Sequence, residues 1–260
     1  MFVKKVPVFQ AGKVLTIEML DALKNTIEAI GYRKYQGFSD GILNGFQVEV
    51  SEDYLTVDKG SIIFGEELYM VTEKTKVPYV GNGMMQLLVL RVGDTEKAGQ
   101  FEIREAEIRT IREEDAILSD IEIARFRLQK GAKLRTNFLS LRDMSTAYDT
   151  VNLCNARWAA YGENSMAYPL LEMAAKEIEK KENADFYDEL FLQAVYTAHG
   201  ETVPLPLIDR YIKGKLGKSN IASLEARYRC LLEAVGRVES REGDARPRER
   251  RMGNNRIIVD

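Results

Sequence analysis

The sequence predicts an α+β protein with an N-terminal helix, a mostly antiparallel β-sheet or barrel-like domain, a small C-terminal helical bundle and an extended tail. Three observations support this class. Apolar residues recur at spacings of three and four before residue 31, alternate with polar residues from residue 46, and return to helical spacing after Pro169. The 260 residues are enough for one large domain or two modest ones. We therefore expect a β-rich scaffold (1–131), a connecting segment (132–168), a helical domain (169–236) and a basic extended arm (237–260).

The first predicted helix follows Thr16, a residue suited to the N-cap, and ends at Gly31. Its apolar stripe consists of Ile17, Leu20, Leu23, Ile27 and Ile30. A stripe of this kind needs an apolar surface to pack against.

Short strands joined by glycine turns should follow. Residues 46–50 and 54–57 alternate between apolar and polar side chains, which is typical of strands with one solvated face. The Asn82-Gly83 step lies between residues 76–80 and 84–91, and such a step favours a tight hairpin. Residues 84–92 are almost continuously apolar, as in a central strand covered on both faces.

A β-bulge is expected between Ile123 and Ala124, because the apolar positions change parity there. Beyond Gly131 the period weakens, and the aromatic residues of the segment up to Tyr168 should pack on the sheet. Four helices are then predicted: from Pro169, from a cap at Asp185 to His199 with Gly200 as its stop, from Pro206 to Ile212, and from a cap at Ser219 or Asn220 to Val235.

The sequence carries no recognisable catalytic or metal-binding motif, and we expect no cofactor. Residues 214–219 imitate the end of a phosphate-binding loop, but Ile212 stands where that loop needs a glycine, so a turn between helices is expected. His199 is the single histidine, which limits triads and histidine metal sites. Cys154 and Cys230 are expected to be buried small hydrophobic residues.

Carboxylate chemistry is the remaining enzymatic route, because a glycosidase needs only two convergent acidic side chains. The acidic runs 113–115 and 177–182 are typical of solvated surfaces. The alternative function is therefore carbohydrate binding or processing, with exposed aromatic residues Trp158, Tyr161 and Tyr168 near a carboxylate pair.

The formal net charge of -3 makes nucleic acid an improbable partner without a local basic patch. No apolar run approaches the roughly 20 residues that span a bilayer, and the N-terminus shows no export signal. We expect synthesis in the cytoplasm and no membrane span.

The C-terminal arm combines basic and apolar residues. Interleaved acidic residues weaken the case for nucleic acid, whereas an apolar β-branched end can add a strand to a partner sheet. The predicted partner-binding residues are Arg246, Arg248, Arg250, Arg251, Arg256, Ile257, Ile258 and Val259.

Three stretches carry a family resemblance: residues 11–16 (Ala-Gly-Lys-Val-Leu-Thr), 40–45 (Asp-Gly-Ile-Leu-Asn-Gly) leading into a strand, and 148–152 (Tyr-Asp-Thr-Val-Asn). Their order resembles proteins encoded in the tail and baseplate regions of Gram-positive prophages and phage tail-like particles. The resemblance implies a structural component that binds other tail or baseplate proteins, forms a homo-oligomer and is assembled into a virion or phage tail-like particle. It brings no catalytic residue.

Overall fold

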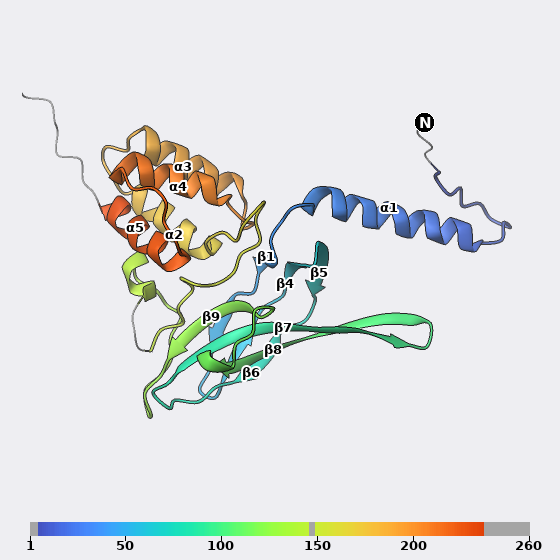
Figure 1. The fold of residues 1–260 in the computed structure, drawn as a ribbon, viewed down its shortest axis with the longest axis horizontal. Helices are drawn as coiled ribbons and strands as arrows, with labels where there is room; N and C mark the ends of the chain where they lie inside the picture. Colours follow the sequence, from blue (N-terminus) through green and yellow to red (C-terminus); the bar gives the residue numbers. More distant parts are fainter. Residues whose placement is uncertain (1–4, 146–148, 237–260) are drawn as a thin grey trace, which may run out of the picture.

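The computed structural model describes residues 5–145 and 149–236. In this part the chain forms an N-terminal helix, three antiparallel sheets and four C-terminal α-helices (Figure 1). The predicted α+β class is confirmed. Each sheet of the described chain is open and three-stranded, so the barrel that the sequence left possible does not form here. The predicted arm, 237–260, lies outside the described residues.

The first helix, α1, spans Ile17–Tyr35. Thr16 caps it as predicted, because its Oγ1 accepts a hydrogen bond from the Met19 amide at 3.3 Å. The prediction that Gly31 ends the helix is wrong. An interior glycine costs only about 1 kcal/mol relative to alanine, and the last turn is held by burial of Tyr35. Tyr35 belongs to a small apolar cluster with Phe38, Leu43, Ile63 and Ala159.

Within the described residues, nine strands form the three sheets, whose orders are β1-β4-β5, β2-β3-β6 and β8-β7-β9. The strands are β1 (Gly41–Gly45), β2 (Val48–Val50), β3 (Tyr54–Val57), β4 (Gly60–Phe64), β5 (Glu67–Val71), β6 (Thr75–Pro78), β7 (Met85–Ala98), β8 (Phe101–Arg112) and β9 (Ile121–Arg127).

The predicted hairpin around Asn82-Gly83 is wrong. Strand β6 pairs with β3, whereas β7 pairs with β8 and β9. The glycine turn crosses from one sheet to another at the end of β9, where the Gly83 amide donates to the Leu128 carbonyl at 2.8 Å. A Cβ on Gly81 would lie 2.9 Å from the Gln129 carbonyl oxygen, so this close approach requires glycine.

Strand β7 is central, as its apolar run predicts. It lies between β8 and β9, and all four residues from Leu87 to Leu90 are buried. The predicted bulge in β9 is also present: Leu88 pairs with Ala124 and Val89 with Glu122, which leaves Ile123 as the extra residue. Both Ile123 and Ala124 are therefore buried in spite of the change in parity.

The segment that joins the sheets to the helices also seals two sheet edges. Asn152 forms an isolated bridge with Arg125 of β9, and Trp158 forms one with Ile42 of β1. Trp158 is 4% exposed, which confirms that this segment packs on the sheets. Covered edges of this kind cannot pair with other chains.

The C-terminal helices form a four-helix bundle in which α2 packs on α3 and α5, and α4 packs on α3 and α5. The helices are α2 (Tyr168–Ile178), α3 (Phe186–Thr197), α4 (Leu205–Leu216) and α5 (Leu224–Gly236), and two 3-10 turns precede them, η1 (Glu113–Asp115) and η2 (Leu141–Ser145).

Three predicted helix boundaries are wrong. Helix α3 ends at Thr197 instead of His199, and α4 continues to Leu216 instead of Ile212, where Gly217 adopts a left-handed conformation with φ 70°. Helix α5 begins after Ser223, whose Oγ accepts from the Ala226 amide at 3.2 Å, so neither Ser219 nor Asn220 is its cap.

One continuous core joins the sheets to the bundle. It contains buried residues of all three sheets, the connecting segment and the four C-terminal helices. Representative members are Leu55, Leu88, Trp158, Leu171 and Leu231.

Candidate assembly surface

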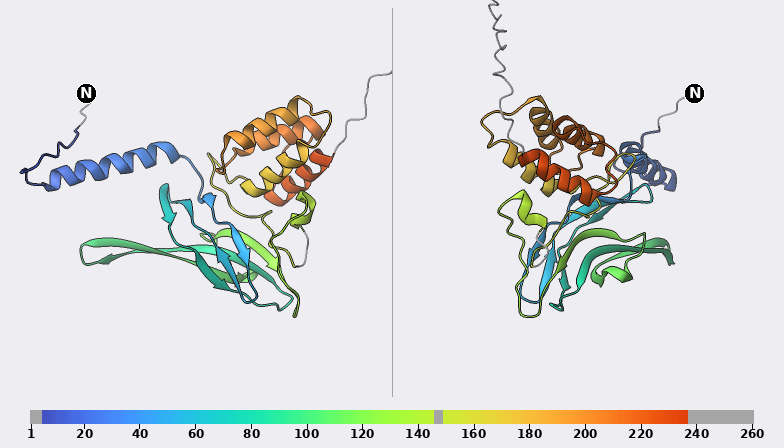
Figure 2. Two further views of the ribbon diagram at one scale, coloured as in Figure 1. Left: turned by 180° about the vertical axis from the view of Figure 1, so that it is seen from behind. Right: turned by 60° about the vertical axis from the view of Figure 1, so that its left-hand side comes forward.

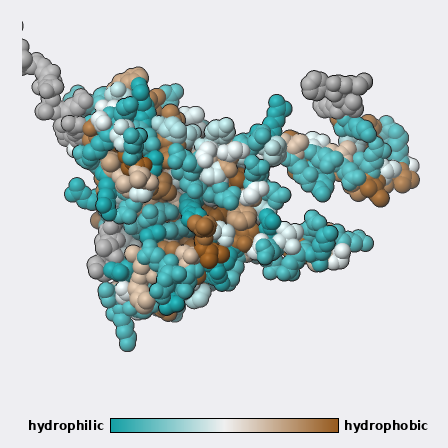
Figure 3. All heavy atoms as spheres, viewed as in Figure 1, coloured by the Kyte–Doolittle hydropathy of each residue, from teal (hydrophilic) through white to brown (hydrophobic). Residues whose placement is uncertain are grey.

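Two segments project from the body of the molecule in the same direction. One is α1 with the residues before it (5–35), and the other is the ribbon formed by the far ends of β7 and β8 (93–106) (Figures 1 and 2). We call them the helix prong and the ribbon prong. Strand β9 pairs with β7 only as far as Leu90, so the ribbon beyond it has two strands. Open space separates the prongs in the space-filling view (Figure 3).

The helix prong exposes its apolar stripe. Ile17 is 79%, Ile27 70% and Ile30 65% exposed. The apolar surface that this stripe needs is therefore not supplied by the described chain, which packs only against the last turn of α1. A single helix of this length draws most of its stability from packing of its apolar face. The exposed stripe consequently indicates a surface made for another molecule.

Charge on the helix prong is divided between its two sides. At 100° per residue, Lys24, Arg33 and Lys34 lie beside the apolar stripe. Glu18 and Asp21 lie away from the stripe by the same geometry, whereas Glu28 lies beside Lys24, with which it pairs at 3.6 Å. The apolar stripe is thus bordered by three basic side chains and one acidic one.

The ribbon prong has one open face that is both apolar and acidic. Phe101 is 73% and Ile103 42% exposed. Ile103 pairs with Glu96 across the ribbon, and Glu105 follows two residues later, so these side chains share one face. A two-stranded ribbon standing alone in water is marginally stable at best. This face of the ribbon therefore also indicates a surface that binds another molecule.

The other face of the ribbon is tied to the body. Arg104 donates through Nη1 to the Tyr69 hydroxyl of β5 at 2.9 Å, and through Nε to Thr95 Oγ1 at 2.9 Å. Between Val92 and Thr95 the register shifts, which places an extra β7 residue opposite Glu105. A bulge of this kind bends and twists a strand pair, so it sets the direction in which the ribbon leaves the sheet.

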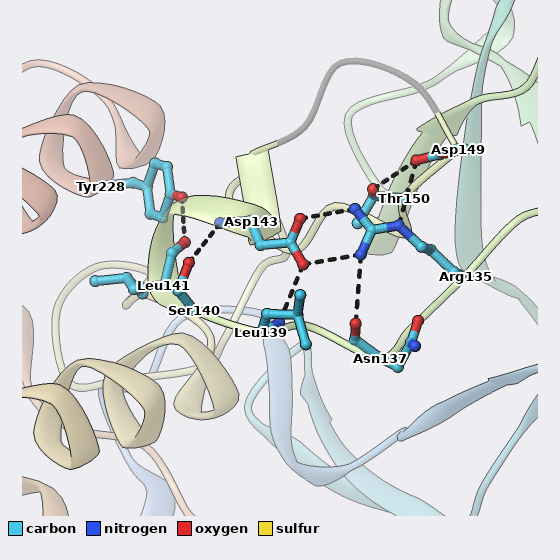
Figure 4. Close-up of polar contacts among 9 residues, drawn as sticks. All are labelled: Arg135, Asn137, Leu139, Ser140, Leu141, Asp143, Asp149, Thr150 and Tyr228. Carbon is cyan, nitrogen blue, oxygen red and sulfur yellow. Dashed lines mark hydrogen bonds and ion pairs between the residues drawn. The ribbon is translucent and has the colours of Figure 1, made fainter.

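A polar junction fixes the helical bundle to the sheets (Figure 4). Arg135, which follows β9, binds both carboxylate oxygens of Asp143 in η2, at 2.8 and 2.7 Å. The same guanidinium reaches Asp149 at 3.4 Å, and these carboxylates raise the pKa of Arg135. From the bundle, the Tyr228 hydroxyl donates to the Leu141 carbonyl at 2.6 Å. The turn η2 therefore links the segment that follows β9 to the helical bundle.

The bundle contains a buried ionic cluster that resembles an acid-base site in composition. Lys215 Nζ donates to Asp185 at 2.7 Å and to Asp188 at 2.9 Å, and the Tyr211 hydroxyl donates to Asp188 at 3.0 Å. Burial alone raises the pKa of Asp188, but the hydrogen bonds from Lys215 and other donors lower it below its usual value. Asp185 also caps α3 through the Tyr187 and Asp188 amides, as predicted. Lys181 Nζ also pairs with Asp188 at 3.2 Å, so two lysines balance the two carboxylates, and the contacts of Lys215 join α3 to α4.

The predicted partner-binding residues, Arg246, Arg248, Arg250, Arg251, Arg256, Ile257, Ile258 and Val259, lie outside the described residues. The exposed aromatic face expected for carbohydrate is contradicted at its centre. Trp158 is buried and its ring lies 6.4 Å from that of the half-buried Tyr168, whereas Tyr161 is 71% exposed. The three rings do not form one exposed platform.

Two further features concern residues 5–145 and 149–236 alone. No group of three or more His, Cys, Asp or Glu residues there has the arrangement of a metal site. No helix there has both the length and the apolar character needed to cross a bilayer. Cys154 is buried and Cys230 partly buried, and both are free thiols.

The sequence pattern predicts the stripe of the helix prong but not the ribbon prong. The signal was present in part: Phe101 and Ile103, and then Ala106 and Ile108, recur at every second residue among charged ones, well beyond the length needed to cover the sheet. A strand as long as β8 can pair along its whole length only if β7 continues past its apolar run, through polar residues, to Ala98. Polarity in this half of β7 concealed the strand.

No protein-family model and no curated protein matches the chain. Among solved structures, the crystal structure of TssK is similar with a TM-score of 0.39 and 9% identity, over 90% of this chain and 71% of that one. The TssK-TssF-TssG baseplate subcomplex of the type VI secretion system, determined by cryo-electron microscopy, gives a TM-score of 0.38 and 11% identity over 89% of this chain and 99% of that one. The likeness to these baseplate proteins is distant, and at such TM-scores it carries no argument about this chain.

Proposed function

We propose that the chain is a structural component of a phage tail, baseplate or related contractile injection particle, and that it acts by binding neighbouring subunits instead of by catalysis. The observation that supports this proposal is the pair of prongs, whose apolar faces the described chain leaves exposed. The order of the three sequence stretches that resemble phage tail proteins supports the particle class.

The energetics favour binding partners for both prongs. Burying one fully exposed Ile or Phe side chain contributes about 1.5–3 kcal/mol, and each prong presents at least two large apolar side chains on one face. Contiguous exposed apolar surface of this kind marks interaction sites in soluble proteins. The rigid base formed by the sheets, η2 and the bundle would let both prongs present these faces without further ordering cost to the body.

The test is incorporation into particles. The gene is expressed with its neighbours, particles are purified, and the amount of this protein per particle is measured by mass spectrometry. Wild-type protein should be present at a fixed ratio to the other structural proteins. The variant Ile17→Ser/Ile27→Ser should fold, because both side chains are exposed, but its amount in particles should fall by about tenfold or more.

A matched control removes two exposed leucines far from the prongs. Leu118 is 92% and Leu139 89% exposed, so Leu118→Ser/Leu139→Ser changes the same amount of surface chemistry elsewhere. This control should enter particles like the wild type. Absence of the wild-type protein from purified particles would show that the proposed function is wrong.

A further inference from the structure

The two prongs have opposite charge. The helix prong, residues 5–35, holds five basic and three acidic side chains, and the ribbon prong, residues 93–106, holds four acidic and two basic ones. The same difference holds on the apolar faces: Lys24, Arg33 and Lys34 border the stripe of α1 with Glu28 as the acidic residue beside them, whereas Glu96 and Glu105 border Phe101 and Ile103. Each face therefore has an apolar centre, with flanks of a sign that complements the other.

Several of these charges have no ionic partner within residues 5–145 and 149–236. Arg33 on the helix prong and Asp94, Glu96 and Glu105 on the ribbon prong form no ion pair there, and Lys24 has only the exposed Glu28 at 3.6 Å. Charges that are already paired internally would lose that pairing on docking. These side chains are free to pair with a second molecule.

The two surfaces also match in length. With 19 residues, α1 is about 28 Å long at 1.5 Å per residue. The ribbon beyond Val92 extends for six residues of β7, or about 20 Å. Most of the apolar stripe can therefore lie along the ribbon face.

Within one chain, the helix prong cannot cover the open face of the ribbon prong. The face of the ribbon that carries Arg104 is bonded to Tyr69 of the body, so the face with Phe101 and Glu105 points away from it. Open space also lies between the prongs of one molecule (Figure 3). The complementary surface must come from a neighbour.

We infer that the helix prong of one copy binds the open ribbon face of a second copy, and that the contact is reciprocal, giving a twofold dimer. Because both prongs project in the same direction, two copies facing each other bring each helix against the ribbon of its partner (Figure 2). The inference deepens the proposed function and rests on it, since it names the first partner in assembly as this chain itself.

Charge reversal tests the pairing of the prongs. Sedimentation velocity over a range of concentrations should show that the wild-type full chain dimerises, and more weakly as salt rises. Lys24→Glu/Arg33→Glu makes both prongs acidic, and Glu96→Lys/Glu105→Lys makes both basic. Each variant alone should dimerise at least about tenfold more weakly, whereas an equal mixture of the two should recover dimers.

Glu18→Lys/Asp21→Lys is the matched control, since it reverses two charges on the side of α1 that lies away from the stripe. It should dimerise at least as well as the wild type, and circular dichroism should show that every variant is folded. The inference is overturned if either prong variant alone dimerises like the wild type, if their mixture stays monomeric, or if the control is as impaired as they are.

Failure of this inference and failure of the proposed function give different results. A wild-type chain that is monomeric at all concentrations but present in purified particles overturns the reciprocal dimer and leaves the structural role intact. A dimer that responds to charge reversal as expected but is absent from particles supports the pairing of the prongs and overturns the particle role.

Discussion

Leu88 lies at the centre of the sheet formed by β8, β7 and β9. It lies in the central strand β7, it is 0% exposed, and it faces Ala124 next to the bulge in β9. We expect Leu88→Asp to prevent folding, because an unpaired carboxylate there costs several kcal/mol, a large share of total stability. Loss of the cooperative unfolding transition in circular dichroism would confirm it. Ala98→Asp, on the exposed end of the same strand, is the control and should unfold like the wild type.

The cluster around Asp188 makes stability depend on pH. The folded-state pKa of Asp188 is lowered, so its contribution is present above the unfolded pKa of about 3.9 and is lost as pH falls through the folded value. Asp188→Asn should lower the free energy of unfolding at neutral pH by roughly 3–5 kcal/mol, because it leaves the buried Lys215 with one carboxylate fewer.

Urea unfolding at several pH values measures both effects. The difference between wild type and Asp188→Asn should shrink as the pH is lowered below about 4. The control is Lys218→Met, which removes an exposed pair with Glu233 and should cost less than about 1 kcal/mol. A difference that stayed constant down to pH 2 would contradict the assignment of the pH dependence to Asp188.

At the scale of the element, we expect alanine to have opposite effects on stability at two glycines inside helices. Gly31 of α1 has open space around it, so Gly31→Ala should stabilise the helix by up to about 1 kcal/mol. A Cβ on Gly214 of α4 would lie 2.3 Å from the Tyr187 ring, so Gly214→Ala should instead separate α3 from α4 and destabilise the protein by roughly 1–3 kcal/mol. Thermal unfolding of the two variants decides. A stabilising Gly214→Ala would show that the Tyr187 ring moves aside without cost.

The elements that the sequence predicted correctly are those specified by local patterns that burial enforces. Thr16 and Asp185 cap their helices, and the parity change at Ile123 marks a bulge because both neighbours must reach the core. The turn at Asn82-Gly83 was interpreted wrongly because its residues permit a hairpin but do not choose the partner strand. That choice depends on the free edge of β3, which accepts β6 over Tyr54–Val57.

The sequence predicted only part of the candidate assembly surface, for a related reason. Spacing shows that α1 has an apolar stripe, but whether its own chain covers the stripe is decided by where the connection to β1 directs the helix. Packing of Tyr35 beside Leu43 and Ile63 fixes that connection, and these contacts span almost 30 residues of sequence. Periodicity therefore predicted the residues of the helix prong without predicting their exposure.

At the scale of the whole molecule, the continuous core stabilises the fold, whereas the two prongs present the exposed apolar surfaces. The core holds sheets and bundle together through buried residues of both, and the junction at Arg135, Asp143 and Tyr228 fixes η2 between them (Figure 4). The prongs contribute little to that core, so changes on their exposed faces should alter association far more than folding. This separation is what allows binding and stability to be tested independently.

The last prediction concerns the C-terminal arm, which lies outside the described residues. Its sequence combines Arg248, Arg250 and Arg251, which can form charge-assisted contacts with an acidic neighbour, with the apolar end 257–259, which can extend a sheet. Burying two or three such aliphatic side chains, at about 1.5–3 kcal/mol each, would offset part of the entropy lost in ordering the arm, about 1–2 kcal/mol per residue, and the strand hydrogen bonds and arginine contacts would have to supply the rest. Deleting residues 253–260 should therefore leave thermal unfolding of the isolated protein nearly unchanged and reduce its incorporation into particles.

A substitution inside the arm separates its two parts. Ile257→Ser/Val259→Ser removes the apolar contacts and keeps every arginine, so it should reproduce most of the loss seen on deletion if strand addition provides the binding energy. Arg250→Ser/Arg251→Ser should have a smaller effect that grows weaker at high salt, since exposed ion pairs contribute about 0–1 kcal/mol each. The melting temperature of each isolated variant is measured in the same series. A much lower melting temperature of the deletion variant would show that the arm packs on its own chain. Docking to a neighbour would then be the wrong explanation of its sequence.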